Sequence, residues 1–270
     1  MGSANADLVF VNGRVITVNP HDELAEAVAV AGNRIVHVGS TQSVRALVGN
    51  HTRVVDLAGR ALTPGFVENH MHLSNAAENL DWVDCSPEAV SSIAELTQAI
   101  ARRVEQTPPG EWVLGWGFDH HRLAEGRYPN RHDLDPVSPN NPVALRQRES
   151  MSWTANTAGL RRMGIQDTTP DPPGGPMQRD EHGAPLGPMW DNCRVTFIFP
   201  ALPQLTVDQL CAGYRQVGQY LNRLGVTSAD EAAIRHADEL QAWQQLRDSG
   251  HQTVRIYLNI YPLYGSTWEK

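Results

Sequence analysis

The chain has 270 residues, 41% of them hydrophobic, which is enough for one large domain or two modest ones. Its formal net charge of -8 at pH 7 argues against nucleic acid or an anionic membrane as the main partner. Three widely spaced cysteines, the absence of a basic and apolar leader, and no run near the ~20 apolar residues that cross a bilayer together predict a cytoplasmic protein with reduced thiols.

Short apolar segments separated by turn residues dominate the first 60 residues. Residues 7–17 cluster apolar side chains around Asn12-Gly13, a pair that favours a tight hairpin turn. The sequence also predicts a strand pair at 27–30 and 34–38, a short helix at 43–48 and a strand at 54–57. Several short strands joined by tight turns indicate a small antiparallel sheet.

Residues 63–72 read Thr-Pro-Gly-Phe-Val-Glu-Asn-His-Met-His, an apolar run that stops at two histidines. We expect a strand at 62–67 that leads into them. Because side chains alternate along a strand, His70 and His72 face the same way, and two imidazoles on one face can share one divalent metal ion. The alternative is that both histidines only satisfy local hydrogen bonds where the strand meets solvent.

This segment resembles the first-strand signature of the amidohydrolase superfamily, usually Pro-Gly-Phe, a hydrophobic residue, Asp, any residue, and then His-x-His. Within that superfamily the chain is similar to the YtcJ-like amidohydrolases, whose members include N-substituted formamide deformylases. Further matches follow in order along the chain, at residues 6–17 (ADLVFVNGRVIT), 35–39 (IVHVG), 55–65 (VDLAGRALTPG), 111–119 (EWVLGWGFD), 171–175 (DPPGG) and 224–230 (LGVTSAD). Together they cover nearly the whole chain.

The resemblance implies an α/β fold, namely a partial (β/α)8 barrel of the TIM type with an insertion, beside part of a small β-sandwich domain. Residues 1–62 would form the N-terminal part of the sandwich. Residues 63–270 would form the first part of the barrel, with the subfamily insertion at about 76–200.

The periodicity of the remaining sequence agrees with alternating helices and strands. It predicts helices at 91–106, 156–163, 210–221 and 237–249, strands at 112–118, 143–145, 226–228 and 253–260, and an irregular loop at 168–188. Only about three barrel strands are recognisable, whereas eight β/α units need about 250 residues. We therefore expect a truncated chain, because the family's downstream lysine strand, two further histidines and catalytic aspartate have no match here.

Acidic residues follow the strand predicted at 226–228. Carboxylates at the C-terminal end of a barrel strand are typical of functional residues. We expect Glu231, or its neighbour Asp230, to join His70 and His72 as a ligand of a divalent metal ion, most simply Zn²⁺. The alternatives are a supporting role beside the ligands or the start of the next helix. Glu68, where the family has Asp, either orients an imidazole or is solvated.

Three residues are predicted to contact substrate: Trp116, Met151 and Asn156. Trp116 and the nearby pair His120-His121 are expected to line a substrate entrance, the alternative being a surface loop with one packed tryptophan. The segment that ends at Asn156 resembles a family segment reading Gly-His and later Asn, in which the histidine contacts substrate. Met151 replaces that histidine, whereas Asn156 is retained, either for substrate or as the cap of the following helix.

These residues predict a metal-dependent hydrolase of non-peptide C–N bonds, acting on a small-molecule amide or formamide through metal-activated water. The truncated chain is expected to be inactive alone, with the proton-shuttling aspartate beyond residue 270. Two alternatives stay open, a catalytically dead metal-binding remnant and a non-enzymatic ligand-binding protein. The oligomeric state also stays open, a homo-oligomer included.

Overall fold

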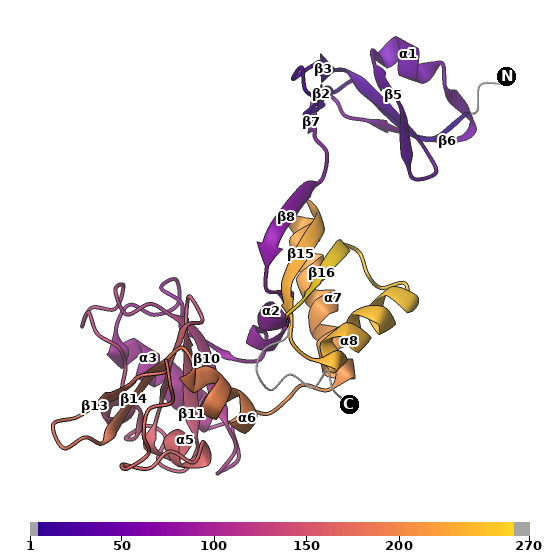
Figure 1. The fold of residues 1–270 in the computed structure, drawn as a ribbon. Helices are drawn as coiled ribbons and strands as arrows, with labels where there is room; N and C mark the ends of the chain where they lie inside the picture. Colours follow the sequence, from indigo (N-terminus) through magenta and orange to yellow (C-terminus); the bar gives the residue numbers. More distant parts are fainter. Residues whose placement is uncertain (1–4, 262–270) are drawn as a thin grey trace. The chain divides into compact units, whose positions relative to one another are not determined.

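The computed structural model of the protein describes residues 5–261, which form two compact units (Figure 1). The first unit runs to Val67 and includes Gly225–Thr227, and the second takes Glu68–Leu224 and continues from Ser228. None of the helices in this part of the chain combines the length and the apolar character that crossing a membrane requires. Each unit has its own architecture.

The first unit consists of two small sheets, ordered β5-β4-β1-β6 and β3-β2-β7. Its elements are β1 Ala6–Val11, β2 Arg14–Ile16, β3 Leu24–Ala25, β4 Ala27–Ala31, β5 Arg34–Gly39, α1 Thr41–Arg45, β6 Val48–Asp56 and β7 Ala61–Leu62. Small apolar side chains of β1 and β4 form its core together with Val44. The hairpin of β4 and β5 is confirmed. The prediction of a purely antiparallel sheet is wrong, because β6 and β7 pair in parallel with β1 and β2.

The turn pair Asn12-Gly13 does not close a hairpin, contrary to the prediction, because β1 and β2 belong to different sheets. Asn12 has a left-handed φ of 56°, and its Nδ2 donates to Asp56 Oδ2 over 2.9 Å. A Cβ atom on Gly13 would lie 2.2 Å from Leu57 Cδ1, so the close packing there requires glycine. The pair carries the chain from one sheet to the other, and local turn propensity does not specify which strands then pair.

The second unit contains a three-stranded sheet ordered β16-β15-β8. This part comprises β8 Phe66–Met71, α2 Leu73–Asn79, α7 Val207–Arg223, β15 Val226–Ile234, α8 Ala237–Asp248 and β16 Arg255–Ile260. Strands β15 and β16 pair in parallel and are connected by α8, which makes the β–α–β unit from which barrels are assembled. Helix α7 starts at a capping box between Thr206 and Gln209. Within the described residues this sheet is open and does not close into a barrel.

Strand β15 is longer than its sequence suggested, since it continues to Ile234 instead of ending at Ser228. Asp230 and Glu231 therefore lie inside the strand, and the expectations that they follow it or begin a helix are wrong. Ala229 and Glu231 are both buried, as the alternation of a strand requires. An acidic residue ordinarily marks the end of an apolar strand, and this one is accommodated by hydrogen bonds that only the folded chain supplies.

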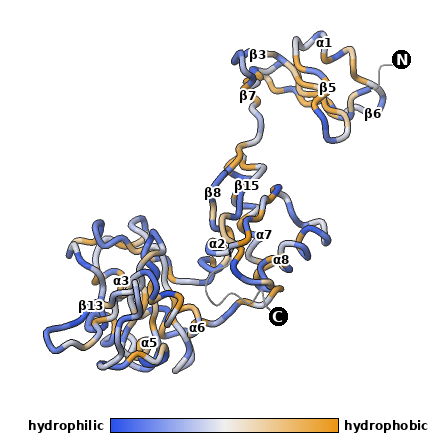
Figure 2. The backbone as a smooth tube through the Cα atoms, in the orientation of Figure 1, coloured by the Kyte–Doolittle hydropathy of each residue, from blue (hydrophilic) through white to orange (hydrophobic). Residues whose placement is uncertain are grey.

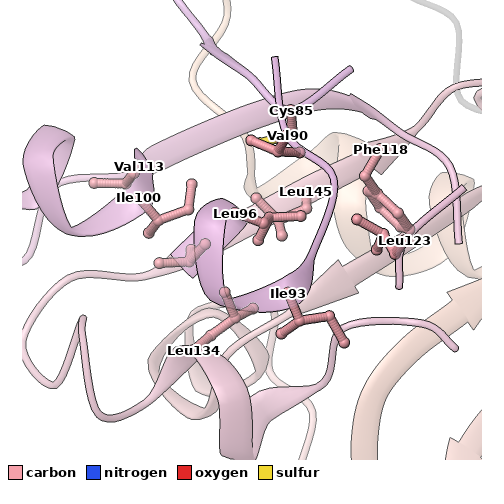
Figure 3. Close-up of a cluster of buried hydrophobic side chains, with 11 residues drawn as sticks. Cys85, Val90, Ile93, Leu96, Ile100, Val113, Phe118, Leu123, Leu134 and Leu145 are labelled. Carbon is pink, nitrogen blue, oxygen red and sulfur yellow. The ribbon is translucent and has the colours of Figure 1, made fainter. Parts of the chain in front are cut away.

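The rest of the second unit forms a six-stranded sheet ordered β13-β14-β12-β11-β10-β9. Its elements are β9 Val83–Asp84, α3 Ile93–Val104, β10 Val113–Phe118, α4 Arg131–Leu134, β11 Val143–Gln147, β12 Ser152–Ala155, α5 Thr157–Arg162, β13 Met177–Arg179, β14 Pro185–Trp190, a π-helix at Arg194–Ile198 and α6 Phe199–Ala201. Leu96 and Ile100 of α3 pack against Val113, Phe118 and Leu145 on one face of this sheet (Figure 3).

The segment 168–188 is more regular than the predicted irregular loop. Strands β13 and β14 pair in antiparallel fashion within and beyond it. Figure 2 shows the turn between them as hydrophilic. The dense Pro, Gly and Asp content hid two short strands whose buried positions, such as Met177 and Met189, contact the core on the other face of the sheet.

Candidate metal centre

His70 and His72 lie where β8 ends and α2 begins. The strand covers Phe66–Met71, further along the chain than the predicted 62–67, and His72 is the N-cap residue of α2. The two ring centroids are 5.5 Å apart, with the ring planes at 80°. The His72 side chain is 47% exposed. The structure thus brings the two imidazoles together at an accessible strand end, as the spacing predicted.

The charges around His72 favour its neutral imidazole. Burial of the ring lowers the pKa of His72, and His70 and the guanidinium groups of Arg235 and Arg146 lower it further. The neutral ring is the form that coordinates metal ions.

Glu231 is the carboxylate that lies beside this pair. Its side chain is fully buried, and its Oε1 atom lies 3.9 Å from Nδ1 of His72. Oε2 accepts a hydrogen bond of 2.9 Å from the Ser74 backbone N–H, and Oε1 accepts one of 3.2 Å from that of Ala233. Burial raises the pKa of Glu231 to about 7, although both backbone donors oppose the shift. The carboxylate is therefore fixed by protein donors and faces one nitrogen of one histidine.

The other two acidic candidates contact different groups. Asp230 lies on the opposite side of β15, where its Oδ1 accepts a hydrogen bond from Asn259 Nδ2. Glu68 accepts a hydrogen bond of 3.1 Å from the backbone N–H of His70, not from an imidazole. Within the described residues, neither carboxylate is therefore in contact with a histidine ring of the pair.

The donor set fits a divalent metal ion in part. Two imidazoles at one strand end are nitrogen ligands of the kind that Zn²⁺ takes, and catalytic zinc usually has about three protein ligands. Among residues 5–261, however, no three His, Cys, Asp or Glu side chains gather closely enough to hold a metal ion. His70 and His72 would hold the metal, and a third ligand is not brought to them in this part of the chain.

An ion-pair network that was not predicted from the sequence lies on α2, the helix whose N-cap residue is His72. Glu78 of α2 receives Arg146 Nη1 at 3.3 Å and Arg235 Nη2 at 3.4 Å, one at each carboxylate oxygen. Arg235 also contacts Glu239 at 3.2 Å. The network joins β11, α2 and the segment between β15 and α8, which are far apart in sequence. Such pairings lack a local sequence signal.

The two arginines of this network respond differently to their surroundings. Burial lowers the pKa of Arg146, because Glu78 compensates for the lost solvation only in part. Burial opposes the charge of Arg235 too, but Glu78, Glu239 and Glu231 outweigh it and raise its pKa. Both remain cations, since guanidinium groups do not lose their proton in proteins. Arg146 therefore depends on Glu78 more than Arg235 does.

Trp116 lies opposite Arg146, a member of this network, on the neighbouring strand of the sheet. Trp116 is in register with Arg146 on β11, and Arg146 with Trp153 on β12. The Arg146 guanidinium carbon lies 4.6 Å from the ring centroid of Trp82 and 5.8 Å from that of Trp153. The half-buried Trp116 is thus the cross-strand neighbour of Arg146, whose guanidinium group pairs with Glu78 on α2. A role in substrate contact stays a prediction.

Met151 is 47% exposed and directly precedes β12. The residue before it, Ser150, stands where the resembling family segment has glycine and adopts a left-handed φ of 62°. This conformation favours glycine and costs other residues about 1–2 kcal/mol. The glycine of the family pattern is therefore explained by the left-handed backbone at this position, which Ser150 adopts at a cost in stability.

We expect Ser150→Gly to stabilise the protein by about 0.5–1 kcal/mol, because glycine relieves the left-handed strain but orders more backbone on folding. Urea unfolding of both proteins followed by circular dichroism measures the difference. Ser249→Gly is the matched control, since Ser249 has an ordinary φ of -77° and should gain nothing from glycine. Equal or lower stability of Ser150→Gly would contradict this interpretation of Ser150.

Asn156 caps α5 and is fully buried. Its Oδ1 accepts hydrogen bonds from the backbone N–H groups of Val143 at 2.8 Å and Gly159 at 2.7 Å. Its Nδ2 donates to the carbonyl oxygens of Ser138 and Asn141, each at 2.9 Å. All four hydrogen-bonding positions of the amide are thus used by the backbone. These contacts are those of the alternative in which Asn156 caps the helix, and they leave no hydrogen-bonding position of the amide for a substrate.

The rings of His120 and His121 pack against one another instead of lining an open entrance. Their ring centroids are 3.8 Å apart, and His120 stacks on Tyr128 at 4.0 Å. Burial lowers the pKa of His120, and His121 adds to the effect. Nδ1 of His120 is buried and has no hydrogen-bond partner among the described residues. These contacts agree with the packed alternative more than with an open entrance.

Comparison with known proteins gives this geometry a context. The profile of the Amidohydrolase family matches residues 53–266. An N-substituted formamide deformylase of Arthrobacter pascens is 40% identical over 181 residues, which cover 67% of this chain and 33% of the relative. The putative amidohydrolase YtcJ of Bacillus subtilis (strain 168) is 31% identical over 267 residues, covering 97% of this chain and 50% of the relative.

The fold also has a counterpart among solved structures. An uncharacterized metal-dependent hydrolase from Pyrococcus horikoshii OT3 superposes with a TM-score of 0.68 at 21% identity, over 94% of this chain and 48% of that one. This likeness shows a common TIM-barrel-like α/β fold. The chain spans between a third and a half of the length of these proteins. Since the family profile covers most of its residues, the chain belongs to the amidohydrolase family.

Proposed function

We propose that this chain contributes the first metal-binding strand of a metal-dependent hydrolase that cleaves non-peptide C–N bonds in small-molecule amides or formamides. The observation that carries the proposal is the pair of imidazoles at the accessible end of β8, 5.5 Å apart. The formamide substrate class is suggested by the 40% identical deformylase, and Zn²⁺ by the nitrogen donors.

His70 and His72 would hold the metal ion. When bound, the ion supplies an electrophile for the substrate carbonyl and acidifies a water molecule. Burial, His70 and the nearby guanidinium groups lower the pKa of His72, which favours the neutral ring that binds metal ions. Trp116, opposite Arg146 on the neighbouring strand, would contact the apolar part of an amide substrate.

A second candidate function is metal binding without turnover. Met151 at the place of a substrate-contacting histidine favours it, as does the lack of a three-residue ligand group among residues 5–261. Both functions share the histidine pair and differ only in whether bound metal supports hydrolysis.

Zinc binding to the full chain tests the proposal, measured by competition with a chromophoric chelator together with elemental analysis. We expect the wild type to bind Zn²⁺ and His70→Ala/His72→Ala to lose more than about 100-fold in affinity, beyond what loss of an outer hydrogen-bond partner costs. His182→Ala is the control, because that ring is 81% exposed and remote in sequence from the pair. Equal binding by the double variant would overturn the proposed site.

Hydrolysis of an N-substituted formamide by the zinc-loaded chain, followed by formate release, then separates the two functions. Formate release that depends on both histidines supports the hydrolase. Zinc binding without formate release, over a panel of simple amides, supports the metal-binding protein.

A further inference from the structure

We infer that Glu231 is a positioning residue that orients the His72 ring and is not a ligand of the metal ion, and that Ser74 and Tyr214 hold it in place. This inference rests on the proposed metal site and assigns parts to three residues around it. An imidazole that binds a metal ion through one nitrogen commonly donates its other N–H to a carboxylate, which fixes the tautomer and the ring.

The His72 nitrogen that faces the carboxylate shows which nitrogen is left for a metal ion. Nδ1 of His72 lies 3.9 Å from Glu231 Oε1, which leaves Nε2 as the nitrogen available to a metal ion. The distance is longer than a hydrogen bond, and hydrogen bonds of this kind often shorten when the ligand arrives. The exposure differs sharply between the partners, since the His72 side chain is 47% exposed and that of Glu231 is 0% exposed.

Protein donors already engage both oxygens of Glu231. Ser74 contributes its backbone N–H to Oε2 at 2.9 Å and its hydroxyl at 3.3 Å, and Ala233 N–H binds Oε1 at 3.2 Å. A carboxylate held at both oxygens in the interior of the unit cannot swing out to an ion without breaking these bonds. It can, however, accept one more N–H from the neighbouring ring, because each oxygen has two lone pairs.

Ser74 contacts a buried pair of stacked aromatic side chains, Tyr214 and Trp243, through the hydroxyl of Tyr214. The Ser74 hydroxyl lies 2.8 Å from the hydroxyl of Tyr214, whose ring stacks on Trp243 at 4.0 Å with an interplanar angle of 7°. Ser74 is also in the first turn of α2, two residues after His72. The contacts thus run from α8 and α7 through Ser74 to Glu231 on β15 and then to His72, so packing of the helices sets the ring orientation.

The tautomer of His72 in the metal-free chain tests the contact directly. Nitrogen-15 NMR at pH 8 is expected to show the Nδ1–H tautomer in the wild type, with the His72 signals assigned by their loss in His72→Gln. Glu231→Gln should shift the ring toward the Nε2–H tautomer. Asp230→Asn, the neighbour on the other side of β15, should leave it unchanged. The same tautomer in Glu231→Gln and the wild type would overturn the inference.

Metal binding provides the second readout and separates a positioning role from that of a ligand. We expect a loss of Zn²⁺ affinity of about 10–100-fold in each of three variants, Ser74→Ala, Tyr214→Phe and Glu231→Gln. After substitution with Co²⁺, the visible absorption bands of all three should match those of the wild type, because the ligands are unchanged. A band pattern in Glu231→Gln altered as in His72→Ala would make Glu231 a ligand and overturn the inference.

Two further outcomes remain decisive. If Glu231→Gln fails to fold, the His72 tautomer and the Zn²⁺ affinity are measured in Ser74→Ala and Tyr214→Phe instead. Wild-type values for both variants would overturn the inference. If the wild type binds no metal ion at all, the proposed function fails, and the tautomer experiment still decides whether Glu231 orients His72.

Discussion

Asn156→Ala is expected to lower the free energy of unfolding by about 4 kcal/mol, because it leaves three buried backbone groups without partners at about 1–3 kcal/mol each before relaxation. The fourth group, the carbonyl oxygen of Asn141, still accepts a hydrogen bond of 2.9 Å from the Ser138 hydroxyl. The amide bridges the start of α5 to β11 and to the loop before it, through Gly159, Val143, Ser138 and Asn141. Urea unfolding monitored by tryptophan fluorescence measures the loss.

Asn156→Asp is the informative partner of this variant. Aspartate keeps the two acceptor contacts to Val143 and Gly159 and loses the two donations, so we expect an intermediate stability. Thr157→Ala is the control, since the neighbouring Thr157 makes a single side-chain hydrogen bond, to Asp135 at 2.6 Å, on a partly buried surface. A loss below about 1 kcal/mol in Asn156→Ala, no larger than an ordinary helix cap, would contradict the bridging role.

Glu78→Ala is expected to cost about 3 kcal/mol, the low end for breaking a buried ion pair, because the Glu78 side chain is still 25% exposed. The variant leaves Arg146, whose side chain is only 7% exposed, without its carboxylate partner. Arg235 keeps Glu239 at 3.2 Å and should be affected less. Thermal and urea unfolding give the size of the effect.

Variants of the partners locate the cost of losing Glu78. Glu78→Ala combined with Arg146→Met should be more stable than Glu78→Ala alone, because the unpaired charge is removed while the apolar contacts to Trp82 are kept. Glu88→Ala, at an exposed position, is the control and should change stability by less than about 0.5 kcal/mol. No recovery in the double variant would show that the loss comes from packing of α2 and not from the unpaired guanidinium.

Local sequence signals predicted the elements that carry the site. Apolar spacing placed α3, α7 and α8 within a few residues of their observed bounds. The signals failed where pairing is non-local. Asn12-Gly13 has the residues of a hairpin turn, yet it connects two sheets, and Asp230 and Glu231 were expected beyond a strand that in fact contains them. Propensity describes a residue's own backbone, whereas pairing and burial depend on partners far along the chain.

Side-chain alternation, a property of any strand, was enough to predict that His70 and His72 lie on one face where a strand ends. Which carboxylate lies beside them could not be predicted locally and depends on how the chain folds. Glu231 is 159 residues from His72, and its burial is tolerated because Ser74 and Ala233 supply the hydrogen bonds that a lone carboxylate lacks. In the same way, Arg146 and Arg235 meet at Glu78 because packing brings three distant segments together.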